Sequence, residues 1–359
     1  MALSPNYSWA EPDNSSLVKN GAQAMRTLGD AIDTSVWNIG FGQAGKNAII
    51  NGNFANWQRG TSFSSTSSNY TADRWIAYSD ATNTVSRQTF TPGTAPVAGY
   101  ESQYFLRLDK SAGGAFTSMS QRIEDVRTFA GQTITISFWA KASATITLAG
   151  GYEQNFGSGG SAAVNSFTIN PTLTTSWARY SYTITLPSIA GKTIGTSSYL
   201  EILNGRCLTG SAIILDFWGV QVEYGSKATP FDTATGTIQG ELAACQRYYA
   251  RFGAKSGGTT NTYAVYGNGI TFSTTNGRVN IPLPVEMRTI PSAVDWGNLA
   301  VNDVTNALIV PSALVLDSGT NHALALGVSF TISGGTASRY VSLINNNNAN
   351  GFIAASAEL

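Results

Sequence analysis

The sequence predicts a mainly β protein, and three observations carry that prediction. The chain has 359 residues, of which 37 are glycine, 11% are aromatic and only 12% are charged, against about a quarter charged in a typical protein. Apolar and polar residues alternate with a period of two in many short runs, as in half-buried strands. Asn-Gly pairs that suit tight turns accompany such runs, at Asn204-Gly205, Asn276-Gly277 and Asn350-Gly351. We therefore expect β-sandwich architecture with one short helix near the N-terminus.

Residues 1–46 are expected to contain that helix. A Pro-containing leader precedes it, and an apolar stripe recurs along one flank at close to heptad spacing. The stripe consists of Val18, Met25, Leu28, Ile32 and Val36. It fits a three-stranded coiled coil, and it fits equally an amphipathic helix that packs on its own chain or on a neighbouring protein. In either case the helix has an apolar face that something must cover.

Residues 47–233 show the strand pattern most clearly, and their length suits one jelly-roll β-sandwich. Two runs each place four apolar side chains on one face, which would build the core between two sheets. These sets are Ile134, Ile136, Phe138 and Ala140, and Tyr180, Tyr182, Ile184 and Leu186. The run from Ala212 to Val222 is apolar on both faces, apart from Asp216, and predicts a central strand.

Residues 240–359 predict a second β region that starts with a short helix. Leu242, Cys245 and Tyr249 recur at helical spacing, and short strands follow them, with a hairpin whose tip is placed at Asn276-Gly277. This region has few charges and several apolar strands, and it need not bury all of that surface within one chain. We expect it to hold the protein together as a homotrimer, because symmetric association closes such an exposed surface.

Charge and cysteine content exclude several functions. Lys plus Arg and Asp plus Glu number 21 each, so no net charge attracts nucleic acid or an anionic membrane. No run approaches the length of a membrane span, and the N-terminus lacks the basic and apolar regions of a secretory signal. Cys207 and Cys245 are too few for a disulfide framework, and no Cys/His cluster predicts zinc. We expect both cysteines to be buried apolar residues.

Three sequence motifs of this chain are similar to motifs found in a known group of proteins. Asn47–Trp75 reads NAIINGNFANWQRGTSFSSTSSNYTADRW, and Leu215–Asp232 reads LDFWGVQVEYGSKATPFD. With ELAACQRYYARF at Glu241–Phe252, the chain resembles bacteriophage tail fibres, minor tail proteins and related receptor-binding proteins. The resemblance implies a carbohydrate-binding-module-like jelly roll, an N-terminal segment that attaches to other virion proteins through the stripe, and a trimeric C-terminal β domain. It also implies a place on the virion, on the tail or another exposed appendage, after synthesis in the host cytoplasm.

Catalytic residues are hard to find in this sequence. His322 is the only histidine, no nucleophile elbow occurs, and we expect His322 to lie at the surface. A glycosidase needs two converging carboxylates, but the candidates are scattered along the chain. They are Glu101, Glu124, Asp125, Glu153 and Glu201. The short repeats of a β-helical tailspike are also missing. We therefore predict that the protein is not an enzyme.

Binding of a glycan needs only aromatic rings that stack on sugars and polar groups that bond hydroxyls. Two stretches are predicted to present such side chains from loops, namely residues 150–163 and the segment around residue 100. The candidates are Tyr152, Glu153, Gln154, Asn155 and Phe156 in the first, and Tyr100 and Tyr104 in the second. The alternative is that these rings pack on their own hairpins or on a neighbouring chain.

Other prominent residues have structural interpretations. The tryptophans Trp57, Trp75, Trp139 and Trp218 are expected in the core. Jelly-roll carbohydrate modules often carry a structural calcium ion, for which Asn51, Asn53 and Asp216 could supply oxygens, but their spacing is not diagnostic. We therefore predict no cofactor and no metal site.

The most probable function from sequence is adsorption to host cell-surface polysaccharide by a trimeric virion appendage, with many weak contacts adding up to avidity. A purely structural tail or capsid decoration protein, without glycan binding, is the alternative. A polysaccharide-cleaving enzyme is the third hypothesis.

Overall fold

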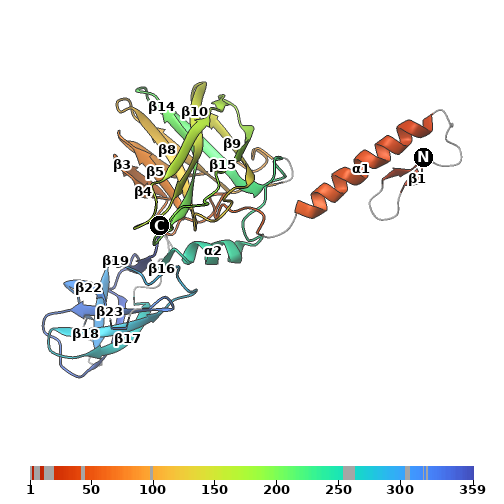
Figure 1. Cartoon of the computed structure of the whole chain (residues 1–359). Coiled ribbons are helices and arrows are strands. Elements are labelled where there is room, and N and C mark those ends of the chain that lie inside the picture. Colours follow the sequence, from red (N-terminus) through yellow and green to blue (C-terminus); the bar gives the residue numbers. More distant parts are fainter. Residues whose placement is uncertain are drawn as a thin grey trace.

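The computed structural model describes the whole chain except residues 1, 4–8, 12–19, 42–44, 98–99, 254–262, 304–307, 318 and 321. The mainly β architecture that the sequence predicts is confirmed. A two-sheet sandwich and a smaller C-terminal β region lie next to each other, and helix α1 (Gly21–Phe41) stands apart from both (Figure 1). In the part of the chain that is described, neither helix is long and apolar enough to cross a membrane.

Helix α1 follows a small hairpin of β1 (Ala2–Leu3) and β2 (Ala10–Glu11). The helix predicted within residues 1–46 is therefore present. Met25 is 67% exposed and Ile32 is also exposed, while Leu28 is half-buried. Val18 lies outside the described residues, and of Val36 only the helical backbone is described. The apolar side chains of Met25 and Ile32 in the stripe are therefore not covered by other residues of the same chain.

The sandwich consists of two antiparallel sheets. The first has the strand order β11-β10-β14-β8-β5-β4, with β12 also paired to β10. Its strands are β4 (Asn69–Tyr70), β5 (Trp75–Ser79), β8 (Phe116–Glu124), β10 (Ile146–Asn155), β11 (Val164–Ile169), β12 (Thr172–Leu173) and β14 (Tyr199–Leu208). The second has the order β13-β9-β15-β7-β6-β3. Its strands are β3 (Ser62–Ser65), β6 (Asn83–Thr89), β7 (Tyr104–Lys110), β9 (Thr133–Ala142), β13 (Ala178–Thr185) and β15 (Ile213–Tyr224).

The core between these sheets follows the predicted alternation. The set from Ile134 to Ala140 is fully buried, and Tyr180, Tyr182 and Ile184 pack against the same core from the edge strand β13. Strand β15 lies between β9 and β7 and is buried on both faces, as predicted. Gly219 in β15 has φ +65°, and an added Cβ would lie 2.7 Å from the Trp139 ring, so only glycine fits this bulge. All four tryptophans expected in the core are buried.

Asn47 ties the start of the sandwich to its end. Its Nδ2 donates to the carbonyl oxygens of Val220 (3.1 Å) and Asp232 (2.9 Å). Its Oδ1 accepts from the backbone N–H groups of Ile49 (2.9 Å) and Val222 (3.0 Å). One buried amide therefore uses both donors and both acceptor positions to hold the entering and leaving chain segments side by side.

The C-terminal region begins with helix α2 (Ile238–Gln246), whose first turn is capped by the Thr237 hydroxyl. A three-stranded sheet, β16-β25-β19, and a seven-stranded sheet, β21-β20-β24-β17-β18-β23-β22, enclose its core. The first comprises β16 (Tyr249–Gly253), β19 (Ala293–Gly297) and β25 (Phe352–Ser356). The second comprises β17 (Val265–Thr271), β18 (Asn276–Pro282), β20 (Leu299–Asp303), β21 (Leu308–Ile309), β22 (Ala313–Leu316), β23 (Ala325–Thr331) and β24 (Tyr340–Asn345).

Of the three predicted Asn-Gly turns, the one at Asn350-Gly351 is present, with the Gly351 N–H bonded to the Asn348 carbonyl (3.2 Å), and the other two are wrong. Asn204-Gly205 lies inside β14 at a bulge opposite β8, where the strand continues without reversing. Asn276-Gly277 starts β18, because Gly277 already pairs with Thr271 and the chain reverses before Asn276. In each case cross-strand pairing determines the conformation more strongly than the turn preference of the dipeptide.

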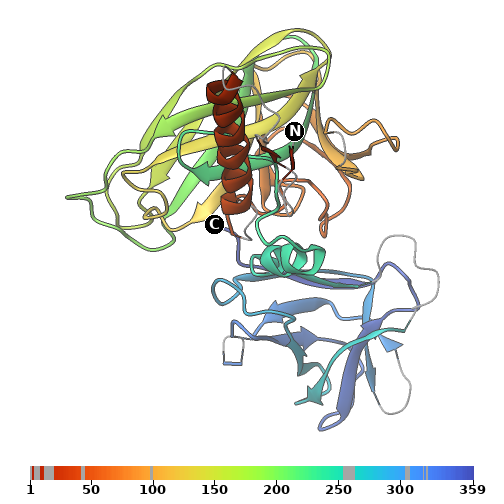
Figure 2. The ribbon, with the colours of Figure 1, turned by 90° about the vertical axis from the view of Figure 1, so that its right-hand side faces the viewer.

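The opening segment of the sandwich also makes the contact with the C-terminal region, below the sandwich in Figure 2. The buried Glu241 of α2 accepts a hydrogen bond from the Asn51 N–H (2.8 Å). Arg74, which is 1% exposed, pairs with Glu358, and its guanidinium lies 3.5 Å from the Tyr248 ring centroid. The first sequence motif thus forms the junction between the two regions.

The carboxyl group of Asp73 lies buried at this junction and gives a pH-dependent prediction. Burial raises the pKa of Asp73 to about 6, although Gln58 donates hydrogen bonds to both carboxyl oxygens. The folded state therefore favours the protonated form, and stability should fall as the pH rises from about 4 to 6. We expect Asp73→Asn to remove about 2 kcal/mol of this pH dependence. Urea unfolding at pH 4 and pH 7 gives the free energy of unfolding of both proteins. The same change between the two pH values in both proteins would contradict a raised pKa for Asp73.

Candidate functional site

Only the second half of residues 150–163 forms the predicted glycine-rich loop, since residues 156–163 connect β10 to β11. Strand β10 runs through Asn155 between β14 and β11, and successive side chains of a strand point to opposite faces. Tyr152 (8% exposed) and Gln154 (1%) face the core, and Phe156 (1%) is buried just beyond the strand. These three side chains are therefore not available to a ligand, which corrects the expectation. Glu153 and Asn155 lie on the outer face.

Tyr100 and Tyr104 lie on the other sheet of the sandwich. The Tyr100 ring packs 5.3 Å from the Trp218 ring and 5.7 Å from the Phe231 ring, in an aromatic cluster on the outer face of that sheet. Tyr104 begins β7, and the Arg87 guanidinium lies 4.2 Å from its ring. Tyr100 thus follows the alternative in which ring packing occupies the side chain. The structure does not bring these tyrosines together with Glu153 and Asn155.

Strand register assembles a site that the sequence did not reveal. Glu153 of β10 lies opposite Glu201 of β14, and Glu201 lies opposite Arg122 of β8. Asn155 lies opposite Tyr199 in the next row. Opposed residues of paired strands share one face of the sheet. We call this outer surface the polar sheet face, and it consists of Tyr78, Ser120, Arg122, Glu153, Asn155, Tyr199 and Glu201.

Hydrogen bonds fix the centre of the polar sheet face. Arg122 Nε donates to Glu201 Oε2 (3.0 Å), and Ser120 Oγ donates to Glu201 Oε1 (2.7 Å). Arg122 Nη2 donates to the Tyr78 hydroxyl (3.2 Å), and the guanidinium lies 4.4 Å from the Tyr199 ring centroid. A charge held in this way between two half-buried rings keeps its geometry without a ligand.

Electrostatics keep the tyrosines neutral and Arg122 charged. Burial raises the pKa of Tyr199 to about 12, and the carboxylates Glu201 and Glu153 act in the same direction, against Arg122. Burial lowers the pKa of Arg122, but Tyr78 and Glu201 more than offset this, so its pKa lies above the ordinary value. Glu153 completes the set, with Oε1 accepting from Asn155 Nδ2 (3.0 Å).

This arrangement suits binding better than acid–base chemistry. The expectation that the carboxylates are scattered is wrong for Glu153 and Glu201, which oppose each other directly. Both carboxyl oxygens of Glu201 already accept hydrogen bonds, from Arg122 and Ser120, and Glu153 accepts one from Asn155. Carboxyl oxygens, a guanidinium and ring faces match the hydroxyls and apolar faces of a sugar.

The remaining sequence candidates have structural environments. Cys207 and Cys245 are buried, as predicted, and His322 is exposed. Asp216 forms ion pairs with Arg107 and Lys141. The side-chain amide of Asn51 forms hydrogen bonds instead with the backbone of Asn56 and Asp73. Within the described ranges, no three His, Cys, Asp or Glu side chains gather as metal ligands do.

Comparison with known proteins finds similarity in structure alone. No family model matches the sequence, and no curated protein matches it. Among solved structures, the N-terminal cellulose-binding domain of a Cellulomonas fimi β-1,4-glucanase is 17% identical, with a TM-score of 0.29 over 43% of this chain and 90% of that one. A xylan-binding domain from Paenibacillus barcinonensis is 14% identical, with a TM-score of 0.32 over 52% of this chain and 99% of that one. The enzymatically active domain of tailspike protein 4 from bacteriophage CBA120 is 16% identical, with a TM-score of 0.30 over 50% of this chain and 22% of that one.

Proposed function

We propose that this protein is a virion appendage, a tail fibre or minor tail protein, that adsorbs to host cell-surface glycans through the polar sheet face. One observation carries the glycan part: the Arg122–Glu201 ion pair lies between the Tyr78 and Tyr199 rings on an outer sheet surface. The virion part rests on the resemblance of Asn47–Trp75 and Leu215–Asp232 to phage appendages. The protein acts by binding and not by catalysis.

Removal of one ring and one acceptor tests glycan binding. Tyr199→Ala with Glu153→Gln should weaken adsorption to host cells, by on the order of 1 kcal/mol per site for the lost ring, and avidity enlarges that effect. Both side chains are half-buried, so the melting temperature should change little. Binding of labelled protein to cells or isolated cell-wall glycan measures the effect.

A matched control is Tyr224→Ala, which removes a mostly exposed ring at the end of β15 in the opposite sheet. It should leave adsorption unchanged. If the double variant adsorbs as well as the original protein, the alternative of a purely structural decoration protein gains support. Release of reducing ends from host polysaccharide would instead favour the enzyme hypothesis.

The N-terminal helix is proposed to attach the appendage to other virion proteins. The motivation is the exposure of Met25 and Ile32, which leaves an apolar stripe without cover in one chain. Ile32→Asp should detach the protein from particles and leave the β regions folded. Thr27→Asp introduces the same charge on an exposed position outside the stripe and should not. Normal copy number of Ile32→Asp in purified particles would exclude the stripe as the anchor.

A further inference from the structure

A row of polar side chains crosses the C-terminal seven-stranded sheet. Asn302 of β20 pairs with Ser342 of β24, Ser342 pairs with Asn268 of β17, and Asn268 pairs with Asn280 of β18. Opposed residues share one face, so the four side chains lie on the outer surface of this sheet. Ser342 Oγ donates to Asn268 Oδ1 (2.7 Å) and links the middle of the row. We call these four residues the amide row.

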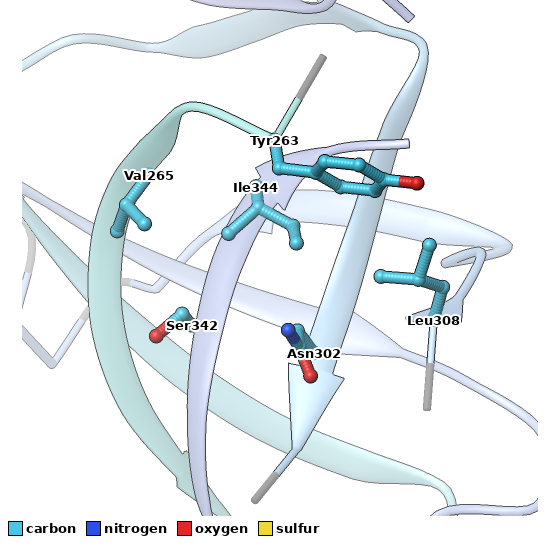
Figure 3. A pocket seen from close by; sticks show the side chains of 6 residues that line it. All are labelled: Tyr263, Val265, Asn302, Leu308, Ser342 and Ile344. Carbon is cyan, nitrogen blue, oxygen red and sulfur yellow. The ribbon is translucent and has the colours of Figure 1, made fainter. Parts of the chain in front are cut away.

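Two hollows lie along the amide row, one at each side of the Ser342–Asn268 bond. The first has a volume of about 390 Å³, within the range of ligand pockets. Figure 3 shows Asn302 and Ser342 in it with the Tyr263 ring, Val265, Leu308 and Ile344 around them. The second, of about 270 Å³, is lined by Asn268, Asn280, Ile270, Phe272 and Thr320 among others.

One of the residues that line each hollow carries a buried polar atom that lacks a hydrogen bond. Asn302 Oδ1 in the first and Thr320 Oγ1 in the second are buried, and neither has a partner in the described part of the chain. Buried polar atoms are nearly always bonded, so these two call for a ligand with hydroxyl or amide donors. A mostly exposed ring accompanies each hollow, Tyr263 and Phe272, both 52% exposed.

The chemistry of the surface selects an uncharged ligand. Among the described residues that line the two hollows, Arg278 is the one charged side chain, and Asp317 already pairs with it (3.4 Å). Amide groups carry both donors and acceptors, which matches the mixed character of sugar hydroxyls. Exposed rings match the apolar faces of sugar rings.

We propose that the amide row is a second binding site, separate from the polar sheet face, for a neutral oligosaccharide that lies across both hollows. Sugar hydroxyls donate to Asn302 Oδ1 and bond Thr320 Oγ1, while two sugar rings stack on Tyr263 and Phe272. The Asn268 and Asn280 amides bond the hydroxyls between them. This site does not depend on the proposed function of the sandwich.

Calorimetric titration of the full-length chain with uncharged hexasaccharides of glucose, xylose and galactose tests the proposal. The background carries Tyr199→Ala and Glu153→Gln, which weaken binding at the polar sheet face, and the part of the remaining binding that Asn302→Leu removes reports the amide row. We expect at least one hexasaccharide to bind. Asn302→Leu should lower the affinity for that hexasaccharide at least tenfold. It should not lower the melting temperature, because Leu removes an acceptor that has no hydrogen bond. Tyr263→Ala should also weaken it, whereas the exposed Asn170→Leu in the sandwich should not.

Two results would overturn the amide-row site. One is the lack of binding of every hexasaccharide. The other is an Asn302→Leu variant with unchanged sugar affinity but a changed mass in light scattering, which would make this face a contact between copies of the chain. Neither result concerns the polar sheet face. That site is tested separately, by the host-cell adsorption of the Tyr199→Ala, Glu153→Gln variant, in which the amide row is intact.

Discussion

Glu358→Ala is expected to lower the free energy of unfolding by about 3–5 kcal/mol, because it leaves a buried guanidinium without its counter-ion. Arg74 is almost completely buried, and its other contacts are the Tyr248 ring and the carbonyl oxygen of Arg122 (2.5 Å). Glu358 also pairs with Arg59 (3.2 Å), so the substitution affects two arginines. Urea unfolding followed by tryptophan fluorescence gives the change.

An exposed ion pair in the same sandwich provides the control. Arg127 pairs with Asp125 at the surface, where both side chains are largely solvated, so Arg127→Ala should cost less than about 1 kcal/mol. Replacement of both Arg74 and Glu358 by methionine should recover part of the lost stability, since the charge of Arg74 is then removed and only Arg59 loses its pair with Glu358. A loss below 1 kcal/mol for Glu358→Ala would show that water or another group reaches Arg74.

Light scattering of the full-length protein is expected to report about three times the 37.9 kDa chain mass. The C-terminal region exposes several apolar side chains away from the two hollows, which association would cover. They are Ile290, Val310, Val315 and Leu324. Obligate interfaces are extensive and apolar, so chain separation and unfolding should coincide.

Point substitutions test this association better than truncation after Asp232. Truncation would remove Glu241 and Glu358, and so leave the Asn51 N–H and the Arg74 guanidinium of the sandwich without their partners. Val315→Asp together with Leu324→Asp should reduce the mass or the cooperativity of unfolding. Ser181→Asp, on an exposed position of β13, should do neither. A full-length monomer that is stable at micromolar concentration would exclude both the trimer and its avidity.

Alternation of side chains was sufficient to predict the sandwich core. Ile134, Ile136 and Phe138 of β9 are buried because a period of two specifies one face of a strand, independently of the partner strands. Glycine misled the prediction for residues 150–155, which are strand and not loop. Gly151 lies within β10, where an added Cβ would come 1.8 Å from the Ser166 carbonyl oxygen. Glycine there permits a close approach of β11, and does not mark a loop.

The polar sheet face could not be predicted for a different reason. Glu153, Glu201 and Arg122 lie far apart in sequence, and only the register of three strands brings them into one row. A shift of one residue in either pairing would move a member to the opposite face. Alternation could have shown that Glu153 and Asn155 share a face, but not which side chains lie opposite them.

The four hydrogen bonds of Asn47, here called the Asn47 clamp, have a mechanical consequence for the proposed appendage, which would be pulled between a particle and a cell. Tension along the chain enters the sandwich near Lys46 and leaves it near Thr233, and the four bonds of Asn47 join these two segments directly. The backbone bonds from Gly45 to Ala234 and from Ala48 to Val222 run in parallel with them. Force would therefore pass across this clamp and not through the strands of the sandwich, so the polar sheet face would keep its geometry until the clamp breaks.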